Sequence, residues 1–209
     1  MRADWRADTP PAGAGVPRRL PHALSQPVVQ ALLDSGAQRL LELGCRDGGF
    51  ASALQCCSWD VLATDADPAV VEWAAGRHPS LPVRQLDVQQ PLPVALAGSF
   101  DAVLAFGLIE RLPQPRRLLD CALAALRPGG YLIVSTPCLG YVQSVGLALA
   151  NRFEQPWDPL VDAGRLRLYS ARSLRLLMQS TPWRAVCVQQ VGRTRFSSSS
   201  LIATARAPT

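Results

Sequence analysis

The segment RLLELGCRDGGF at residues 39–50 constrains the fold more than any other part of the chain. Residues 39–43 form a short apolar run that Gly44 ends, residues 45–49 are small, polar and turn-forming, and helical spacing resumes at Phe50. This pattern predicts a strand, a tight turn and a helix. Because glycine adopts backbone angles closed to other residues and exposes main-chain N–H groups, we expect a ligand to lie against this turn.

The rest of the chain alternates between strand-like and helical segments. Further strands are expected at residues 60–65, 83–88, 100–106 and 131–136, and helices at 25–36, 51–54, 68–76 and 116–126, with a turn at 127–130. Most of these strands are apolar on both faces, which is typical of an open parallel sheet covered by helices. A helix that Ser170 caps and two strands at 185–191 and 201–205 then predict an antiparallel hairpin at the sheet edge.

Composition divides the chain into an arm and one domain. Residues 1–22 are rich in Pro, Gly, Ala and Arg without periodicity, which predicts a flexible N-terminal arm. Residues 23–209 are long enough for a single buried core. Within them, residues 138–169 are too long for a simple connection and contain several aromatic side chains, so we expect a lid over the site or a packed insertion that binds substrate.

Charge, cysteine content and hydropathy indicate which partners, metal sites and cellular locations to expect. The formal net charge is +5 and every basic residue is arginine, but the arginines are spread along the chain, so no nucleic-acid partner is expected. The six cysteines include no CxxC pair and no histidine cluster, so no metal site is expected and free thiols in a reducing cytosol are predicted. No apolar run approaches the roughly 20 residues of a membrane span, and no signal peptide is visible; we expect a cytoplasmic location. The sequence does not indicate an oligomeric state.

The ends of the expected strands locate the candidate site. Ligands of open α/β sheets bind beyond the carboxyl ends of the strands. Gly44, Asp65, Asp87 and Phe106 all lie at or just after strand ends, so we expect them at one edge of the sheet. His78 lies in a helix-to-strand connection, which belongs to the opposite edge, and is set aside.

From about residue 25 to residue 207 the chain resembles the class I S-adenosylmethionine-dependent methyltransferases. Five segments carry the resemblance in the order of the family motifs: ELGCRDG (42–48), TDADP (64–68), QLDV (85–88), FDAVLAFGLIERL (100–112) and RPGGYLIVSTP (127–137). The STP triplet, residues 158–170 and the closing hairpin are most similar to the methyltransferase type 11, ubiquinone-biosynthesis-like branch. The resemblance implies a Rossmann-like, seven-stranded, mostly parallel sheet with helices on both faces and a C-terminal antiparallel hairpin.

The resemblance also implies a site for S-adenosylmethionine. Its residues would be Glu42, Gly44, Cys45, Arg46, Gly48, Asp65, Ala66, Asp87, Val88 and Phe106. The turn would hold the methionine end of the cofactor, with Glu42 near its ammonium group. Asp65 would accept from the ribose hydroxyls and Asp87 from the adenine amino group, between the apolar side chains of Ala66 and Val88. Either aspartate alone could instead be a helix cap or a turn residue.

Three arginines depart from the family pattern. Arg46 stands at the middle glycine of the motif, where its side chain could obstruct the cofactor or point outward. Arg111 and Arg165 stand where relatives often carry histidine. Arginine stays protonated at any usable pH, so neither can act as a general base. Either one could instead hold the carboxylate of an acidic substrate.

The expected reaction is methyl transfer to a small-molecule acceptor, most readily at oxygen. Direct displacement at a sulfonium needs alignment more than protein chemistry. If the acceptor is a phenol or an enol, a base would assist, and the candidates are His22, Glu110, Tyr141 and Asp162. Tyr141, Phe153 and Trp157 could form an apolar wall for the acceptor, or could simply pack in the lid or core.

Two other classes of protein share these features. A non-catalytic binding protein would keep the fold and the pocket while the three arginines replace working residues. A nicotinamide-dependent dehydrogenase would share the glycine turn and Asp65, but Arg46 breaks the GxGxxG spacing that this class requires, and no separate catalytic domain is evident.

Overall fold

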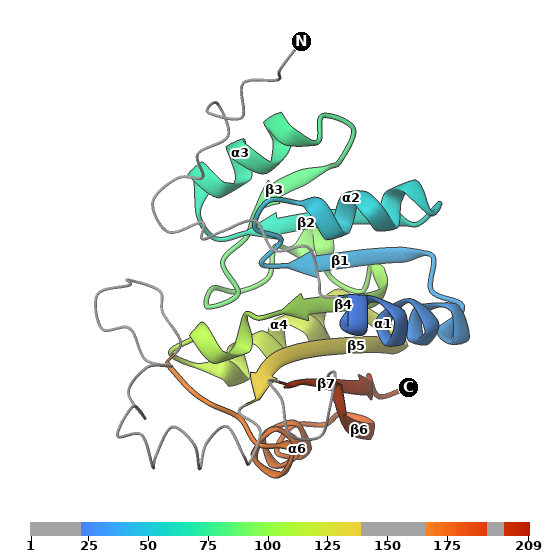
Figure 1. The fold of residues 1–209 in the computed structure, drawn as a ribbon, viewed down its shortest axis with the longest axis vertical. Helices are drawn as coiled ribbons and strands as arrows, with labels where there is room; N and C mark the ends of the chain where they lie inside the picture. The colour runs from blue at the N-terminus through green and yellow to red at the C-terminus, as the bar shows by residue number, and fades with distance from the viewer. Residues whose placement is uncertain (1–21, 139–165, 192–198) are drawn as a thin grey trace.

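The computed structural model describes residues 22–138, 166–191 and 199–209 (Figure 1). Its helices are α1 (His22–Ser35), α2 (Gly49–Cys56), α3 (Pro68–Arg77), α4 (Pro115–Ala125) and α6 (Ala171–Gln179), with single turns η2 (Val94–Leu96) and η3 (Ile109–Arg111). Its strands are β1 (Arg39–Leu43), β2 (Asp60–Asp65), β3 (Val83–Gln85), β4 (Phe100–Phe106), β5 (Leu126–Cys138), β6 (Arg184–Val191) and β7 (Ser199–Arg206). The expected lid and N-terminal arm lie almost entirely outside the described residues.

The strands form one seven-stranded sheet in the order β3-β2-β1-β4-β5-β7-β6. Strands β1 to β5 pair in parallel, while β7 is antiparallel to both β5 and β6. The predicted mostly parallel sheet with a C-terminal antiparallel hairpin at its edge is therefore confirmed. The chain order reverses between β1 and β4, because β1 lies between β2 and β4, and this places the carboxyl ends of β1, β2 and β4 side by side.

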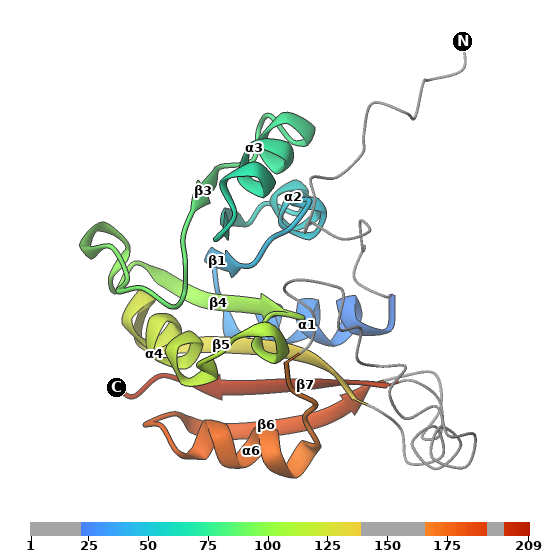
Figure 2. The same ribbon diagram turned by 90° about the vertical axis from the view of Figure 1, so that its left-hand side faces the viewer.

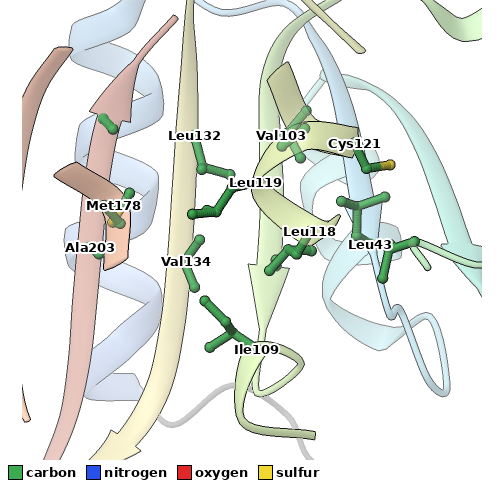
Figure 3. Packing of buried hydrophobic residues seen from close by; sticks show 14 of the residues in the cluster. Leu43, Val103, Ile109, Leu118, Leu119, Cys121, Leu132, Val134, Met178 and Ala203 are labelled. Carbon is green, nitrogen blue, oxygen red and sulfur yellow. The ribbon is translucent and has the colours of Figure 1, made fainter. Parts of the chain in front are cut away.

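Each face of the sheet carries its own hydrophobic core. Successive residues of a strand point to opposite faces, and both faces are buried here. On one face, α1 and α2 cover a cluster that includes Val28, Leu54 and Leu104. On the other, α4 and α6 cover the cluster shown in Figure 3, where Leu119 packs toward the sheet beside Leu132. Figure 2 shows these two layers on opposite sides of the strands.

The helix ends follow local sequence signals. Asp67 accepts a hydrogen bond from the backbone N–H of Ala69 at 2.8 Å, and Pro68 opens α3 as its first residue. Ser170 and Ser173 form a reciprocal capping box at the start of α6. Both caps agree with the sequence prediction. Helix α1, expected from Ser25, begins at His22 and so contains Pro27 in its interior; its buried residues Val28 and Leu32 lie beyond this point.

Strands β3 and β5 differ most from their expected bounds. Strand β3, expected over residues 83–88, ends at Gln85, and residues 86–88 leave the sheet. The turn expected at 127–130 instead belongs to β5 as an irregularity, because the pairing of β4 with β5 shifts between Phe100 and Ala102. A Cβ on Gly130 would lie 2.9 Å from the carbonyl oxygen of Arg127 and 3.1 Å from that of Asp101, so only glycine permits this close approach.

Candidate functional site

The glycine turn after β1 bonds mainly to the neighbouring strand. The N–H groups of Gly44 and Cys45 both donate to the carbonyl oxygen of Thr64 at 2.8 Å, and the N–H of Gly48 donates to Cys45. These three N–H groups are therefore satisfied within the protein, and the contact of a ligand with the turn stays a prediction. Gly44 is needed for a different reason: its φ is +75°, and a Cβ would lie 3.2 Å from the Leu108 side chain.

Asp65 ends β2 with its carboxylate held in a defined orientation. One oxygen accepts the N–H of Arg46 at 3.1 Å and the other accepts the N–H of Asp67 at 3.2 Å. Each carboxylate oxygen has capacity for a second hydrogen bond. The half-buried side chain lines a cleft, so it can accept two further donors from a ligand there.

Glu42 lies beneath the turn and is almost completely buried, at 3% exposure. Burial, followed by the charge of nearby Asp47, raises the pKa of this carboxyl to about 8, although a hydrogen bond from the backbone N–H of Ala51 opposes the shift. Its Oε2 atom is buried without a hydrogen-bond partner. A buried carboxyl with an unsatisfied oxygen would gain most from a cationic neighbour; a contact of Glu42 with the ammonium group of the cofactor stays a prediction.

Arg46 adopts the backbone conformation that glycine favours, with φ of +55°. The chain therefore keeps the shape of the glycine motif although the residue at this position carries a side chain. That side chain is half-buried and lines the cleft. Of the two possibilities left open by the sequence, the structure places Arg46 at the wall of the cleft, and the cleft remains open.

The cleft lies at the carboxyl ends of β1, β2 and β4 and has a volume of about 270 Å³. Its described lining comprises Gly44, Arg46, Asp65, Ala66, Asp67, Val70, Phe106, Gly107, Leu108, Arg111 and Leu112. Five predicted residues are among them: Gly44, Arg46, Asp65, Ala66 and Phe106. Phe106 also stacks edge-on against Phe50, with ring centroids 5.0 Å apart. The volume is near the lower end of small-molecule sites.

Five other predicted residues do not line the cleft. Glu42, Cys45 and Gly48 are buried, and burial raises the pKa of the Cys45 thiol so that it stays neutral. Asp87 accepts the N–H of Gln89 at 2.9 Å within the turn after β3, and Val88 is buried in the core on the α4 side of the sheet. Asp87 therefore has the turn role that the sequence left open; an additional adenine contact stays a prediction.

Gly48 is required by packing between helices. It caps α2 with φ of +70°, and a Cβ there would lie 3.1 Å from Leu81 and 3.2 Å from the His78 ring. His78, set aside from the sequence, does not line the cleft and packs instead against this glycine.

Six lining residues were not among the predicted cofactor-binding residues: Asp67, Val70, Gly107, Leu108, Arg111 and Leu112. Asp67 caps α3 and Val70 belongs to its first turn, and the other four follow β4 directly. The rule that placed the site at the strand ends also covers these residues. All of them except Val70 already lie within the motifs at 64–68 and 100–112, so assigning the motif residues beyond the strand ends to the site would have found them.

Glu110 lies behind the cleft. Its carboxyl is 2% exposed and accepts the hydroxyl of Thr136 at 3.0 Å. Its carbonyl oxygen accepts the N–H groups of Leu166 and Arg167, and the Arg167 guanidinium donates to the carbonyls of Leu112 and Pro113. Through these hydrogen bonds Glu110 links η3 to β5 and to the segment before α6.

The structure describes only some of the other acceptor-side candidates. His22 is the first residue of α1, and Arg111 lines the cleft. Tyr141, Phe153, Trp157, Asp162 and Arg165 lie outside the described residues. All six cysteines are described, and none of them forms a disulfide. Across residues 22–138, 166–191 and 199–209, no cluster of potential metal ligands occurs, and no helix combines the length and apolarity of a bilayer span.

Solved structures share this fold. The N-methyltransferase NodS from Bradyrhizobium japonicum, in complex with S-adenosylhomocysteine, matches with a TM-score of 0.61 at 20% identity, covering 98% of this chain and 92% of NodS. A putative methyltransferase from Bacillus halodurans matches with a TM-score of 0.65 at 12% identity, covering 88% of this chain and 100% of that one. At these identities the likeness establishes the fold alone.

Sequence comparisons establish the family. The model of the methyltransferase domain family matches residues 16–188. The ubiquinone biosynthesis O-methyltransferase of Xanthomonas axonopodis pv. citri is 32% identical over 138 residues, which cover 63% of this chain and 55% of that protein. A probable S-adenosylmethionine-dependent methyltransferase of Mycobacterium tuberculosis is 39% identical over 103 residues, which cover 48% and 36%. The matches thus span about half or less of these relatives.

The chain belongs to the class I S-adenosylmethionine-dependent methyltransferases, a class of enzymes whose cofactor is S-adenosylmethionine. The predicted family is thereby confirmed. The residues present fit this cofactor on two structural grounds: Asp65 presents an oriented carboxylate to the cleft, and Glu42 holds an unsatisfied buried oxygen under the turn.

Proposed function

We propose that this chain transfers a methyl group from S-adenosylmethionine to an oxygen of a small-molecule acceptor. The observation that carries the proposal is the Asp65 carboxylate, oriented by the N–H groups of Arg46 and Asp67 at the wall of the cleft. The choice of oxygen is supported by the Xanthomonas relative, which is named an O-methyltransferase. Structural neighbours named as carbon and N-methyltransferases make the acceptor atom the part that most needs testing.

The proposal assigns the cofactor and the acceptor to opposite sides of the cleft. Asp65, Ala66 and Asp67 form the side at the end of β2, where the ribose would lie. Bound S-adenosylmethionine supplies an activated methyl group, and the chain aligns the acceptor with it.

The opposite side of the cleft would receive the acceptor. Gly107, Leu108, Arg111 and Leu112 follow β4 and form this side. Glu110 stands behind Gly107, with its Oε1 3.5 Å from where a Cβ on Gly107 would lie, so it supports this wall from behind.

Calorimetric titration with S-adenosylhomocysteine tests the cofactor site. Wild-type protein should bind, and Asp65→Asn, which preserves the shape of the side chain but removes its charge, should bind about 10- to 100-fold more weakly, because hydrogen bonds to charged groups contribute about 1.5–3 kcal/mol. Asp60→Ala is the matched control, since it removes an exposed carboxylate at the other end of β2. Equal binding by wild type and Asp65→Asn would refute the proposed role of Asp65.

A second candidate is a cofactor-binding protein without catalysis. Arg46 and Arg111 favour it, because both line the cleft and both depart from the family pattern that the resemblance implies. Turnover with a panel of phenols, enols and carboxylates separates the two candidates. Cofactor binding with no methyl transfer to any acceptor would support the binding protein, whereas a single methylated product would exclude it. Tight binding of NADH would instead support the dehydrogenase alternative.

A further inference from the structure

Acidic residues are absent from the last part of the chain. The arginines are spread over the whole sequence, but no Asp or Glu occurs after Asp162. The same part of the sequence contains Arg165, Arg167, Arg172, Arg175, Arg184, Arg193, Arg195 and Arg206. The net charge of +5 is therefore concentrated at the C-terminal end, and such asymmetry is typical of chains that bind an anionic partner.

The fold brings part of this charge together with a second basic segment. Helices α4 and α6 cover the same face of the sheet (Figure 2). Arg116 and Arg117 are exposed in the first turn of α4, and Arg172 and Arg175 are exposed on α6. We call the exposed surface of these two helices the α4–α6 face. Among its described residues, Asp120 is the acidic member.

Exposed leucines accompany the arginines. Leu176 is 58% exposed on α6, and Leu166, in the segment before the helix, is 51% exposed. Leu174 and Met178 point into the core, so helical spacing places Leu176 on the outer surface, one turn beyond Arg172. An exposed apolar side chain beside basic residues can enter the apolar part of a membrane interface while the charges stay at the headgroups.

Helix stability does not explain these arginines. The first turns of α4 and α6 contain no acidic residue, although negative charge is what a helix N-terminus favours. Arginine in a first turn opposes the helix dipole. The positive charges of Arg116, Arg117 and Arg172 therefore slightly lower the stability of their helices.

We propose that the α4–α6 face binds an anionic lipid surface, with Arg116, Arg117, Arg172 and Arg175 near the headgroups and Leu176, beside Arg172, inserted into the surface. A lipid surface fits better than nucleic acid because the solvent-exposed leucine has no partner of its own chemistry on a phosphate backbone. Arg167 bonds to the carbonyls of Leu112 and Pro113, between η3 and α4. This contact makes the cleft rim continuous with the proposed face, which would place the cleft opening beside the lipid.

Co-sedimentation with vesicles tests the charge requirement. The full chain should bind vesicles of mixed phosphatidylglycerol and phosphatidylcholine, should not bind pure phosphatidylcholine, and should be released as salt rises. Arg172→Glu with Arg175→Glu should weaken binding at least about 30-fold, from the contribution of each arginine near an anionic surface. The control with the same charge change is Arg77→Glu with Arg84→Glu, whose residues are exposed near β3, at the opposite edge of the sheet.

Leu176→Ser tests the apolar contact. This variant should bind anionic vesicles several-fold more weakly, while its affinity for S-adenosylhomocysteine stays at the wild-type value, which separates this proposal from the proposed function. The proposal is overturned if wild type does not bind anionic vesicles, if the two charge variants lose binding equally, or if Leu176→Ser binds as wild type does. It is also overturned if the protein binds duplex DNA or RNA more tightly than the vesicles.

Discussion

Arg46 is the residue at which this chain departs most from the family motif. Its φ of +55° is a conformation that Cβ-bearing residues disfavour by about 1–2 kcal/mol. The N–H of Arg46 donates to Asp65, and this bond depends on the backbone conformation. The hydrogen bond from the Arg46 N–H to the Asp65 carboxylate therefore stabilises the strained backbone conformation of Arg46. Such strain at a binding site is a recurrent feature of proteins.

Arg46→Gly and Arg46→Ala separate strain from the loss of the side chain. Both remove the guanidinium, but only glycine relieves the strain at φ of +55°. We expect the glycine variant to be more stable than the alanine variant by about 1 kcal/mol, measured by urea denaturation. Gly76 in α3 is the control, because a Cβ there meets nothing within 4 Å and φ is not positive. At this position alanine should be more stable than glycine. Equal stability of the two Arg46 variants would argue against strain.

Glu42 should make stability depend on pH. Its carboxyl has a pKa of about 8 in the folded protein and 4.5 as a model value. Between these two pH values the folded state holds a proton that the unfolded state has released, so stability should fall as pH rises from about 4.5 to 8. The loss is about 1.4 kcal/mol per pKa unit, a few kcal/mol in all.

Glu42→Gln is the test, because glutamine keeps the size of the side chain and cannot ionise. The unfolding free energy of the variant minus that of wild type should increase as pH rises from 5 to 8. Taking the difference cancels the titration of the other groups. A difference that stays constant over this range would contradict the raised pKa. The variant should also lose affinity for S-adenosylhomocysteine if Glu42 holds its ammonium group.

At the scale of elements, one buried contact joins three segments around the cleft. Thr136 on β5 donates to Glu110 on η3, whose carbonyl in turn accepts from the segment before α6. Thr136→Val replaces the hydroxyl with a methyl group and leaves a buried carboxylate oxygen short of a donor. The expected loss of stability is about 1–3 kcal/mol by chemical denaturation.

Thr204→Val on β7 is the matched control for this prediction. Thr204 is a partly exposed threonine of the same sheet, and its change should stay within about 0.5 kcal/mol. A Thr136→Val variant as stable as Thr204→Val would show that the contact with Glu110 contributes nothing.

The order of the elements could be predicted because their signals are local. Asp67-Pro68 and Ser170 cap the helices that follow them, and the run ending at Asp65 contains the whole of β2. The failures come from distant contacts. Residues 127–130 have the composition of a turn, but pairing with β4 and the close approach at Gly130 keep them within β5. No local pattern contains that information.

The candidate site was predictable to the same extent. Gly44, Asp65 and Phe106 line the cleft because strand ends fix them there. The use of the Gly44 and Cys45 N–H groups by Thr64 depends on the register of β1 against β2, which sequence patterns do not give. The requirement for Gly48 likewise arises from the approach of His78 and Leu81, more than 25 residues away along the chain.

At the scale of the whole molecule, cofactor binding and folding should be linked. The cleft draws its walls from the ends of β1, β2 and β4 and from α3 and η3, so a ligand there contacts segments on both sides of the position where the strand order reverses. Such a ligand binds only the assembled sheet. At a concentration 100 times its Kd it should stabilise the fold by about 2.7 kcal/mol, whatever the details of its contacts.

Thermal unfolding with and without S-adenosylhomocysteine measures this linkage. At 100 times the Kd found by calorimetry, the midpoint should rise by about 5–10 °C, since 1 kcal/mol corresponds to about 2–4 °C for a chain of this size. Asp60→Ala should show the same rise, whereas Asp65→Asn at the same ligand concentration should show a much smaller one. A ligand that binds by calorimetry but leaves the midpoint unchanged would have to bind the unfolded chain equally well, and the cleft could then not be its site.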